Sequence, residues 1–80
     1  MIKVLFFATL RDKAGTRQAE IDLPERATIS QLKKKLVETY PDLGESIGHC
    51  LAAVNHQYDT DESEIPADAE VAFFPPVSGG

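Results

Sequence analysis

The apolar positions at the start of the chain are spaced as in the two strands of a hairpin. Residues 2–8 read IKVLFFA, rich in β-branched and aromatic side chains, and a polar segment containing a glycine follows at 11–15. This pattern predicts a strand and a turn. Between residues 17 and 23, apolar and polar side chains alternate up to Pro24, which predicts a second, antiparallel strand with one exposed face.

The next segment has the spacing of an amphipathic helix. Thr28 and Gln31 form the pattern T-x-x-Q, a capping box in which side-chain oxygens accept hydrogen bonds from backbone N–H groups at the helix start. Pro41 prevents the helix from continuing. Apolar side chains recur at helical spacing at Ile29, Leu32, Leu36, Val37 and Tyr40. One helix of about three turns, packed on a sheet, is therefore predicted.

The pattern after this helix is more mixed and predicts short elements. Residues 42–48 allow at most a short turn of helix, whereas the apolar run at 50–54 predicts a strand. Residues 55–58 read as a tight turn into a short fourth strand, and an acidic loop spans 59–69. The last predicted strand is 70–74, rich in apolar and aromatic side chains.

The order of these elements predicts an α+β fold in which one mixed sheet curls around one main helix. This is the ubiquitin-like β-grasp arrangement, with a domain at residues 1–74 and an extended tail at 75–80. A ferredoxin-like split βαβ fold is the alternative. It needs a second helix of similar length, for which residues 41–49 are a poor candidate.

Strand alternation places apolar side chains on the face of the sheet away from the helix. If every second residue of the first strand points to the helix, Leu5 and Phe7 point to the outer face. The same alternation in the last strand turns Phe74 outward. These side chains could expose about 400 Å² of apolar surface, a size typical of an interface. The predicted inward-facing residues of the two strands are Ile2, Val4, Phe6, Ala8, Val71 and Phe73.

Composition limits the class of protein. Eighty residues, 42% of them hydrophobic and 26% charged, form one small globular domain without room for a large buried pocket. The net charge of −5 disfavours nucleic acid and acidic membrane surfaces and suits a partner with a basic face. Cys50 alone cannot form an internal disulfide, and we find neither a secretory signal nor a membrane span. We therefore expect a cytoplasmic protein.

The histidines and the cysteine do not form a convincing catalytic or metal site. His49 and Cys50 are adjacent, and neighbouring strand residues point to opposite faces, so we interpret Cys50 as a structural thiol rather than a nucleophile. His49 and His56 have no further ligands at metal-binding spacing. We therefore expect no metal site.

Two charged segments also have ordinary interpretations. Asp59, Asp61, Ser63 and Glu70 match ligand positions of a calcium loop, but Glu64 occupies the position where the sharp turn needs glycine. An acidic, solvated loop is the better interpretation. The run of lysines at 33–35 spreads around a helix and is interpreted as a solvated face that could assist docking of an acidic partner.

The end of the chain has more specific chemistry. Pro75 and Pro76 cannot donate ladder hydrogen bonds and direct the chain off the sheet, followed by Val77 and Ser78. A six-residue tail reaches about 20 Å when extended, and Gly79 and Gly80 can enter a channel too narrow for side chains. The terminal carboxylate is ionised at neutral pH and can attack an activated phosphate. A flexible terminus without function is the alternative.

Three segments together resemble a known family. They are MIKVLFFATLRDKAG at the start, LAAVN at 51–55 and AEVAFFPPVSGG at the end. They are similar to the small subunit of molybdopterin synthase, a ubiquitin-like sulfur carrier. The resemblance implies that Gly80 is adenylated by an ATP-dependent, ubiquitin-activating-like enzyme and converted to a thiocarboxylate. It further implies that the tail enters the large synthase subunit and donates sulfur to cyclic pyranopterin monophosphate.

The resemblance also implies partner contacts and an assembly. Phe7, Tyr58 and Phe74 match the family's apolar contact positions, and Leu5 lies beside them on the predicted outer face. The implied assembly has two small and two large subunits, and the chain is not catalytic alone. No cofactor is bound permanently, since ATP is used by the activating enzyme. Tyr58 departs from the family's aliphatic residue, and Asp68-Ala69 replaces a familiar Asp-Gly, so a positive φ at Ala69 would be strained.

Other functions remain open at this point. A carrier for thiamine synthesis or tRNA thiolation would share the double glycine but not the FFPPV segment. A protein modifier joined to lysines through isopeptide bonds is another possibility. A non-covalent binding module with an inert tail is a further one, and a free-standing enzyme fits least.

Overall fold

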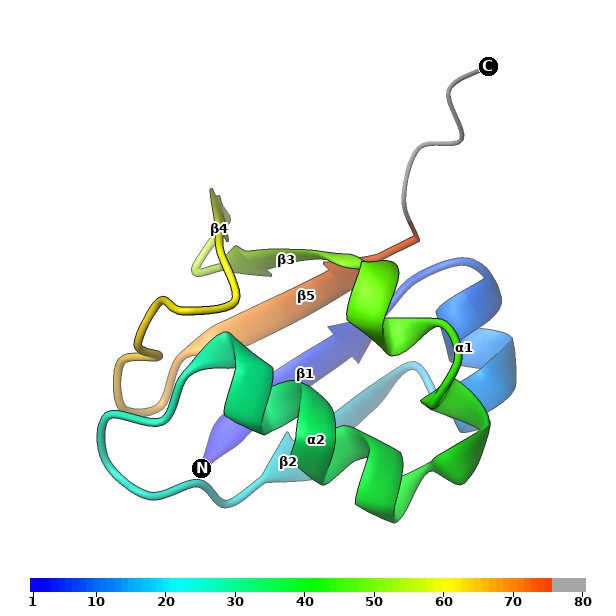
Figure 1. Ribbon diagram of the computed structural model, residues 1–80, viewed down its shortest axis with the longest axis horizontal. Helices are drawn as coiled ribbons and strands as arrows, with labels where there is room; N and C mark the ends of the chain where they lie inside the picture. Colours follow the sequence, from blue (N-terminus) through cyan, green and yellow to red (C-terminus); the bar gives the residue numbers. More distant parts are fainter. Residues whose placement is uncertain (76–80) are drawn as a thin grey trace.

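One mixed sheet organises the fold, and the computed structural model describes residues 1–75. The strand order is β2-β1-β5-β3-β4, with β1 parallel to β5 and the other neighbours antiparallel. The main helix, α2, lies across one face of this sheet (Figure 1). This is the predicted ubiquitin-like β-grasp arrangement. The strands are β1 (Ile2–Phe6), β2 (Gln18–Ile21), β3 (Leu51–Val54), β4 (Gln57–Asp59) and β5 (Glu70–Phe74).

Helix α2 (Ile29–Thr39) begins and ends at the predicted signals. Thr28 Oγ1 accepts a hydrogen bond from the Gln31 N–H at 3.3 Å, and Gln31 Oε1 accepts one from the Thr28 N–H at 2.8 Å. Pro41 starts a separate 3₁₀ helix, η1 (Pro41–Leu43). A second, η2 (Ile47–His49), follows. Neither approaches the length of α2, which excludes the ferredoxin-like alternative.

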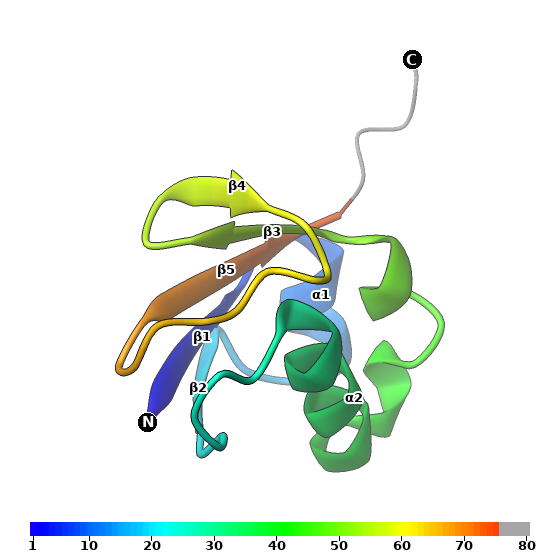
Figure 2. The same ribbon diagram turned by 60° about the vertical axis from the view of Figure 1, so that its left-hand side comes forward.

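The core lies between α2 and the inner face of the sheet. As predicted, the first and last strands bury alternate side chains, and Phe6 packs edge-on against Tyr40 with ring centroids 5.8 Å apart. The short 3₁₀ helices add Leu43 and Ile47 to this core. The view in Figure 2 shows the helices on one side of the sheet. The inward-facing core residues of the two strands are Ile2, Val4, Phe6, Val71 and Phe73.

The connection between β1 and β2 differs from the prediction. The segment expected to be a turn contains a helix, α1 (Thr9–Ala14), which begins directly after Ala8. Leu10 is fully buried, so contact with the core stabilises a helix too short to form alone. Gly15, at φ 77°, ends α1 in the left-handed conformation. The predicted inward position of Ala8 was wrong, because this residue is exposed and has φ 53°.

The predicted solvated face of three lysines is only partly correct. Lys34 and Lys35 are exposed, whereas Lys33 is buried. Lys33 Nζ donates to Asp61 Oδ1 at 2.8 Å and to the Cys50 carbonyl at 3.4 Å. The buried lysine thereby connects α2, the start of β3 and the acidic loop. The buried ammonium group of Lys33 can stay charged because it is paired with the Asp61 carboxylate and hydrogen-bonded to the Cys50 carbonyl.

The residue with positive φ before β5 is Asp68, at φ 57°, and not Ala69. Aspartate tolerates this conformation better than alanine. Ala69 is buried, and its N–H donates to the Pro66 carbonyl at 3.3 Å. The strain that a positive φ at Ala69 would cause is therefore absent from this turn.

The predicted division into residues 1–74 and 75–80 stays a prediction, because 76–80 lie outside the described residues. Within the described part of the chain, no helix is both long enough and apolar enough to cross a membrane.

Two alanine-to-glycine substitutions should have opposite effects on stability. Ala8→Gly should raise the free energy of unfolding by about 1 kcal/mol, because glycine adopts φ 53° and ψ −130° without strain. Ala69→Gly should lower it by about 1–2 kcal/mol, through loss of a buried methyl group and greater freedom of the unfolded chain. Urea denaturation of both variants measures these changes, and a shift of the same sign in both would contradict the backbone assignment.

Candidate functional site: the outer sheet face and the start of the tail

Three predicted partner-binding residues meet on the outer face of the sheet. The rings of Phe7 and Phe74 stack with centroids 4.7 Å apart and planes 11° apart. The ring centroid of Tyr58 lies 6.2 Å from that of Phe74, and the two ring planes are tilted by 59°. The parallel pairing of β1 with β5 brings them together, because Phe6 lies opposite Phe73 and Phe7 follows one residue later. We call Leu5, Phe7, Leu51, Tyr58 and Phe74 the docking face.

The docking face has a hollow at its centre. Leu5 lies opposite Ala72, Ala72 opposite Ala53, and Ala53 opposite Tyr58 across four neighbouring strands. Two alanines between larger side chains leave a hollow of about 260 Å³, also lined by Phe74. Such a surface can receive protruding apolar side chains from another protein.

Leu51 belongs to the docking face but was not among the predicted contacts. It lies opposite Phe74 in the β3–β5 pair. The exposed fractions are 42% for Phe7, 43% for Leu51 and 70% for Tyr58. Alternation within residues 51–54 is the signal that could have placed Leu51 outward. Large apolar side chains gathered on one face are typical of an interaction surface.

The predicted tail starts beside the docking face. Phe74 is the last residue of β5, and Pro75 follows, half-buried near Leu10 and Cys50. A proline here has no N–H for the ladder, so β5 cannot extend as a paired strand through it. The remaining predicted tail residues lie outside the described residues, namely Pro76, Val77, Ser78, Gly79 and Gly80.

Cys50 is a structural thiol in this structure. Its Sγ donates a hydrogen bond to the Ser46 carbonyl at 3.0 Å. Burial raises the pKa of the thiol, an effect that Lys33 and Lys13 oppose. His49 is exposed and ends η2, and Cys50 directly precedes β3, so the two are not neighbouring strand residues as the sequence argument assumed. A raised pKa disfavours the thiolate that a nucleophile needs.

Two acidic side chains of the candidate calcium loop, those of Asp59 and Asp61, are engaged in contacts with other residues. In the candidate calcium loop, Asp59 Oδ1 accepts a hydrogen bond from Ser63 Oγ at 2.6 Å, and Asp61 pairs with Lys33. Residues 1–75 contain no group of three His, Cys, Asp or Glu side chains arranged to hold a metal ion. The arrangement of these acids is that of a hydrogen-bonded loop.

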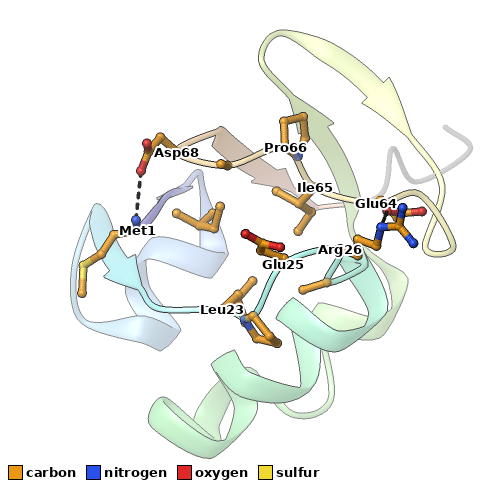
Figure 3. Close-up of a pocket in the computed structure, with 12 residues that line it drawn as sticks. Met1, Leu23, Glu25, Arg26, Glu64, Ile65, Pro66 and Asp68 are labelled. Atoms are coloured by element: carbon orange, nitrogen blue, oxygen red, sulfur yellow. Dashed lines mark hydrogen bonds and ion pairs between the residues drawn. The ribbon is translucent and has the colours of Figure 1, made fainter.

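A second hollow lies at the opposite end of β1 and β5 from the docking face. It has a volume of about 400 Å³. The amino group of Met1 donates to Asp68 Oδ1 at 3.0 Å at its edge, and Arg26 Nε lies 3.9 Å from Glu64 Oε1 (Figure 3). These ion pairs are exposed and surround apolar side chains such as Ile65. In the part of the chain that the structure describes, no nucleophile with an adjacent base lines this hollow.

Comparison with known proteins identifies the family. The family model described as the ThiS family matches residues 4–80. The chain belongs to the ThiS family. This ThiS-family chain is 38% identical over 84 residues to the molybdopterin synthase sulfur carrier subunit of Escherichia coli strain K12, with all of both chains covered. Full-length similarity to proteins of this name supports a sulfur-carrier role in molybdenum cofactor biosynthesis.

Solved structures agree with this family. A crystal structure of SAMP1 from Haloferax volcanii is 30% identical, with a TM-score of 0.86 over 99% of this ThiS-family chain and 98% of its own. A complex of subunits 1 and 2 of molybdopterin-converting factor from Helicobacter pylori 26695 contains a chain that is 21% identical. Its TM-score is 0.66, over 99% of this chain and 97% of that one. The second likeness concerns the fold alone.

Cys50 of this ThiS-family chain should react slowly with iodoacetamide at neutral pH. Burial raises the pKa of the thiol, so the reactive thiolate is scarce below that pKa and increases as the pH rises. Mass spectrometry of alkylation in native buffer and in urea measures the difference. Equal rates in both conditions would contradict a buried thiol.

Proposed function

We propose that this chain carries sulfur on the carboxyl group of Gly80 for the synthesis of molybdopterin. In the proposed cycle, the carboxylate attacks the α-phosphorus of ATP on a ubiquitin-activating-like enzyme and releases pyrophosphate. A sulfur donor at the oxidation level of sulfide then displaces AMP from the acyl adenylate to form a thiocarboxylate. Transfer of this sulfur to cyclic pyranopterin monophosphate, with hydrolysis at the acyl carbon, restores the carboxylate. The observation that supports this most is similarity over the whole chain to a molybdopterin synthase sulfur carrier subunit.

The proposed partner on the docking face is the large subunit of molybdopterin synthase. Phe7 and Phe74 stack where β1 and β5 end, and the tail follows directly from β5. A protein bound there would therefore hold the start of the tail at a fixed place. Pre-positioning of a reactive group in this way lowers the entropic cost of reaction. We propose an assembly of two small and two large subunits in the cytoplasm.

The chain requires no permanently bound cofactor in this proposal. The terminal carboxylate supplies the reactive oxygen, and ATP is consumed in the active site of the activating enzyme. The role of the domain is to present the tail and to be recognised through the docking face. The chain alone is then a carrier, and catalysis belongs to the complexes that it enters.

A second candidate function is protein modification. It is favoured by the likeness to SAMP1, whose full name is small archaeal modifier protein 1. Both functions would start from an activated Gly80. They differ in the product, which is a thiocarboxylate for a carrier and an isopeptide bond to a lysine for a modifier. Carriers for thiamine synthesis or tRNA thiolation differ from our proposal in the acceptor of sulfur.

Deletion of Gly80 should abolish sulfur transfer and leave the domain folded, because the core consists of residues that precede the tail. Intact-mass analysis with the activating enzyme, ATP and a sulfur source detects replacement of one oxygen by sulfur in the unaltered chain. Lysine adducts instead would favour a modifier. Sulfur transfer by the deletion variant would rule out the proposed carrier chemistry.

Phe74→Ala should weaken binding to the large subunit about tenfold or more, as expected for a central aromatic contact. Its effect on the free energy of unfolding should be small, about 1 kcal/mol, since Phe74 is only partly buried. Phe73→Ala is the matched control, because Phe73 is fully buried one residue earlier and its loss should cost about 3–5 kcal/mol. Calorimetric titration and urea denaturation measure the two effects. Unchanged binding by Phe74→Ala would remove this residue from the interface.

A further inference from the structure

A hollow of about 600 Å³ adjoins the docking face on the side of β2. Leu5 and Phe7 belong to both the docking face and the wall of this hollow. Among the described residues, those with charge that line it are Arg11 and Arg17, and none that lines it is acidic. Within residues 1–75, neither guanidinium takes part in an ion pair. The hollow is therefore a cationic site in a protein whose net charge is −5.

The backbone holds the two arginines in a defined frame. Arg11 lies in α1, and its carbonyl accepts a hydrogen bond from the Gly15 N–H at 2.9 Å. Arg17 directly precedes β2, and its carbonyl accepts one from the Phe6 N–H at 2.9 Å. Between them, Thr16 Oγ1 donates to the Gln18 carbonyl at 2.9 Å. The backbone of Arg17 is thus tied to β1, and that of Arg11 is held in α1, which follows β1 along the chain.

Charge is distributed unevenly along the outer face. Across β2, β1 and β5, the row at Lys3 includes Glu20 and Glu70, whereas the next row, at Leu5, has Gln18 in place of an acid. The acids therefore lie toward the start of β1, and the arginines lie at the end where the aromatic rings gather. The net charge predicted a partner with a basic face, but the arginines beside Phe7 favour an acidic group of the partner at this place.

We propose that Arg11 and Arg17 form a carboxylate-binding site at the edge of the docking face. Its occupant is an acidic side chain of the protein that covers Phe7 and Phe74. This inference rests on the proposed function, in which that protein is the large subunit. The planar guanidinium presents several N–H donors that match the two oxygens of a carboxylate. A charged pair at the edge of an apolar contact steers association and fixes the orientation of the partner.

The site explains how an acidic carrier can dock in a single orientation. The apolar rings supply contact area, but stacked rings alone do not define a rotation about the axis of the contact. A carboxylate bound beside Phe7 adds a second, polar point to this contact. With two fixed points, the partner would meet the start of the tail in the same place each time.

The test compares two double charge reversals that change the net charge equally. The variant Arg11→Glu with Arg17→Glu alters the site, and Lys34→Glu with Lys35→Glu alters exposed residues of α2. Binding of each full-length chain to the purified large subunit from the same organism is measured at low and high salt. The arginine variant should bind at least about tenfold more weakly at low salt, and the lysine variant within about threefold of the unaltered chain.

The salt dependence gives an independent outcome. High salt should weaken binding of the unaltered chain to the large subunit more than binding of the arginine variant, because the variant has already lost the ionic contact. Equal affinity of the arginine variant and the lysine variant would overturn the carboxylate site while leaving the sulfur-carrier function in place. Tighter binding by the arginine variant would overturn it too, since the partner would then present a basic group. Failure of the unaltered chain to bind the large subunit would overturn the proposed function and the site with it.

A conservative pair separates charge from geometry. Arg11→Lys with Arg17→Lys keeps both charges but lacks the planar, two-pronged donor. We expect an affinity between those of the unaltered chain and the reversed variant. Thermal denaturation of every variant checks that the fold is retained. We expect it to be retained because both arginines are exposed.

Discussion

The parallel pairing of β1 with β5 is the constraint on which the rest of the structure depends. Val4 lies opposite Val71 and Phe6 opposite Phe73, and all four side chains are buried. Parallel strands cannot be joined by a tight turn, so the chain between them must cross over the sheet. Helix α2 and the two 3₁₀ helices form part of that crossover and cover the inner face (Figure 1). The remaining strands then add to a central pair made from the two ends of the chain.

The same pairing places stability and recognition on adjacent residues. Phe73 points into the core and is fully buried, whereas Phe74 points outward and stacks on Phe7. Because side chains alternate along a strand, a shift of one residue in this register would exchange the two phenylalanines. A register that the core requires thus also determines the docking face. The edge of that face depends on the short helix α1, which brings Arg11 beside Phe7.

Much of the fold could be predicted because the relevant signals are local. The capping box at Thr28 and the stop at Pro41 delimit α2, and alternation in β1 and β5 assigns the inner and outer faces. The outward positions of Phe7 and Phe74 followed from the same alternation. Each of these signals depends on residues within a few positions of one another, where backbone sterics and hydrogen bonding act directly.

The errors arose where distant residues compete with the local pattern. Helix α1 was predicted as a turn, but burial of Leu10 stabilises it as a helix. Lys33 was predicted to be solvated, but Asp61, far along the chain, pairs with it. The turn before β5, whose type the sequence left open, has its positive φ at Asp68 and not at Ala69. For α1 and for Lys33, the deciding contact joins segments that the sequence pattern treats separately.

The sequence by itself determined the β-grasp class, the main helix, the alternation of the central strands and the double glycine of the tail. These depend on periodicity and on residue types whose backbone preferences are intrinsic. Only the tertiary structure decided that Leu51 lies opposite Phe74 and that Arg11 and Arg17 share one hollow beside Phe7. The physical reason is that strand register and helix packing bring together side chains from different elements, and their spacing along the chain does not record that proximity.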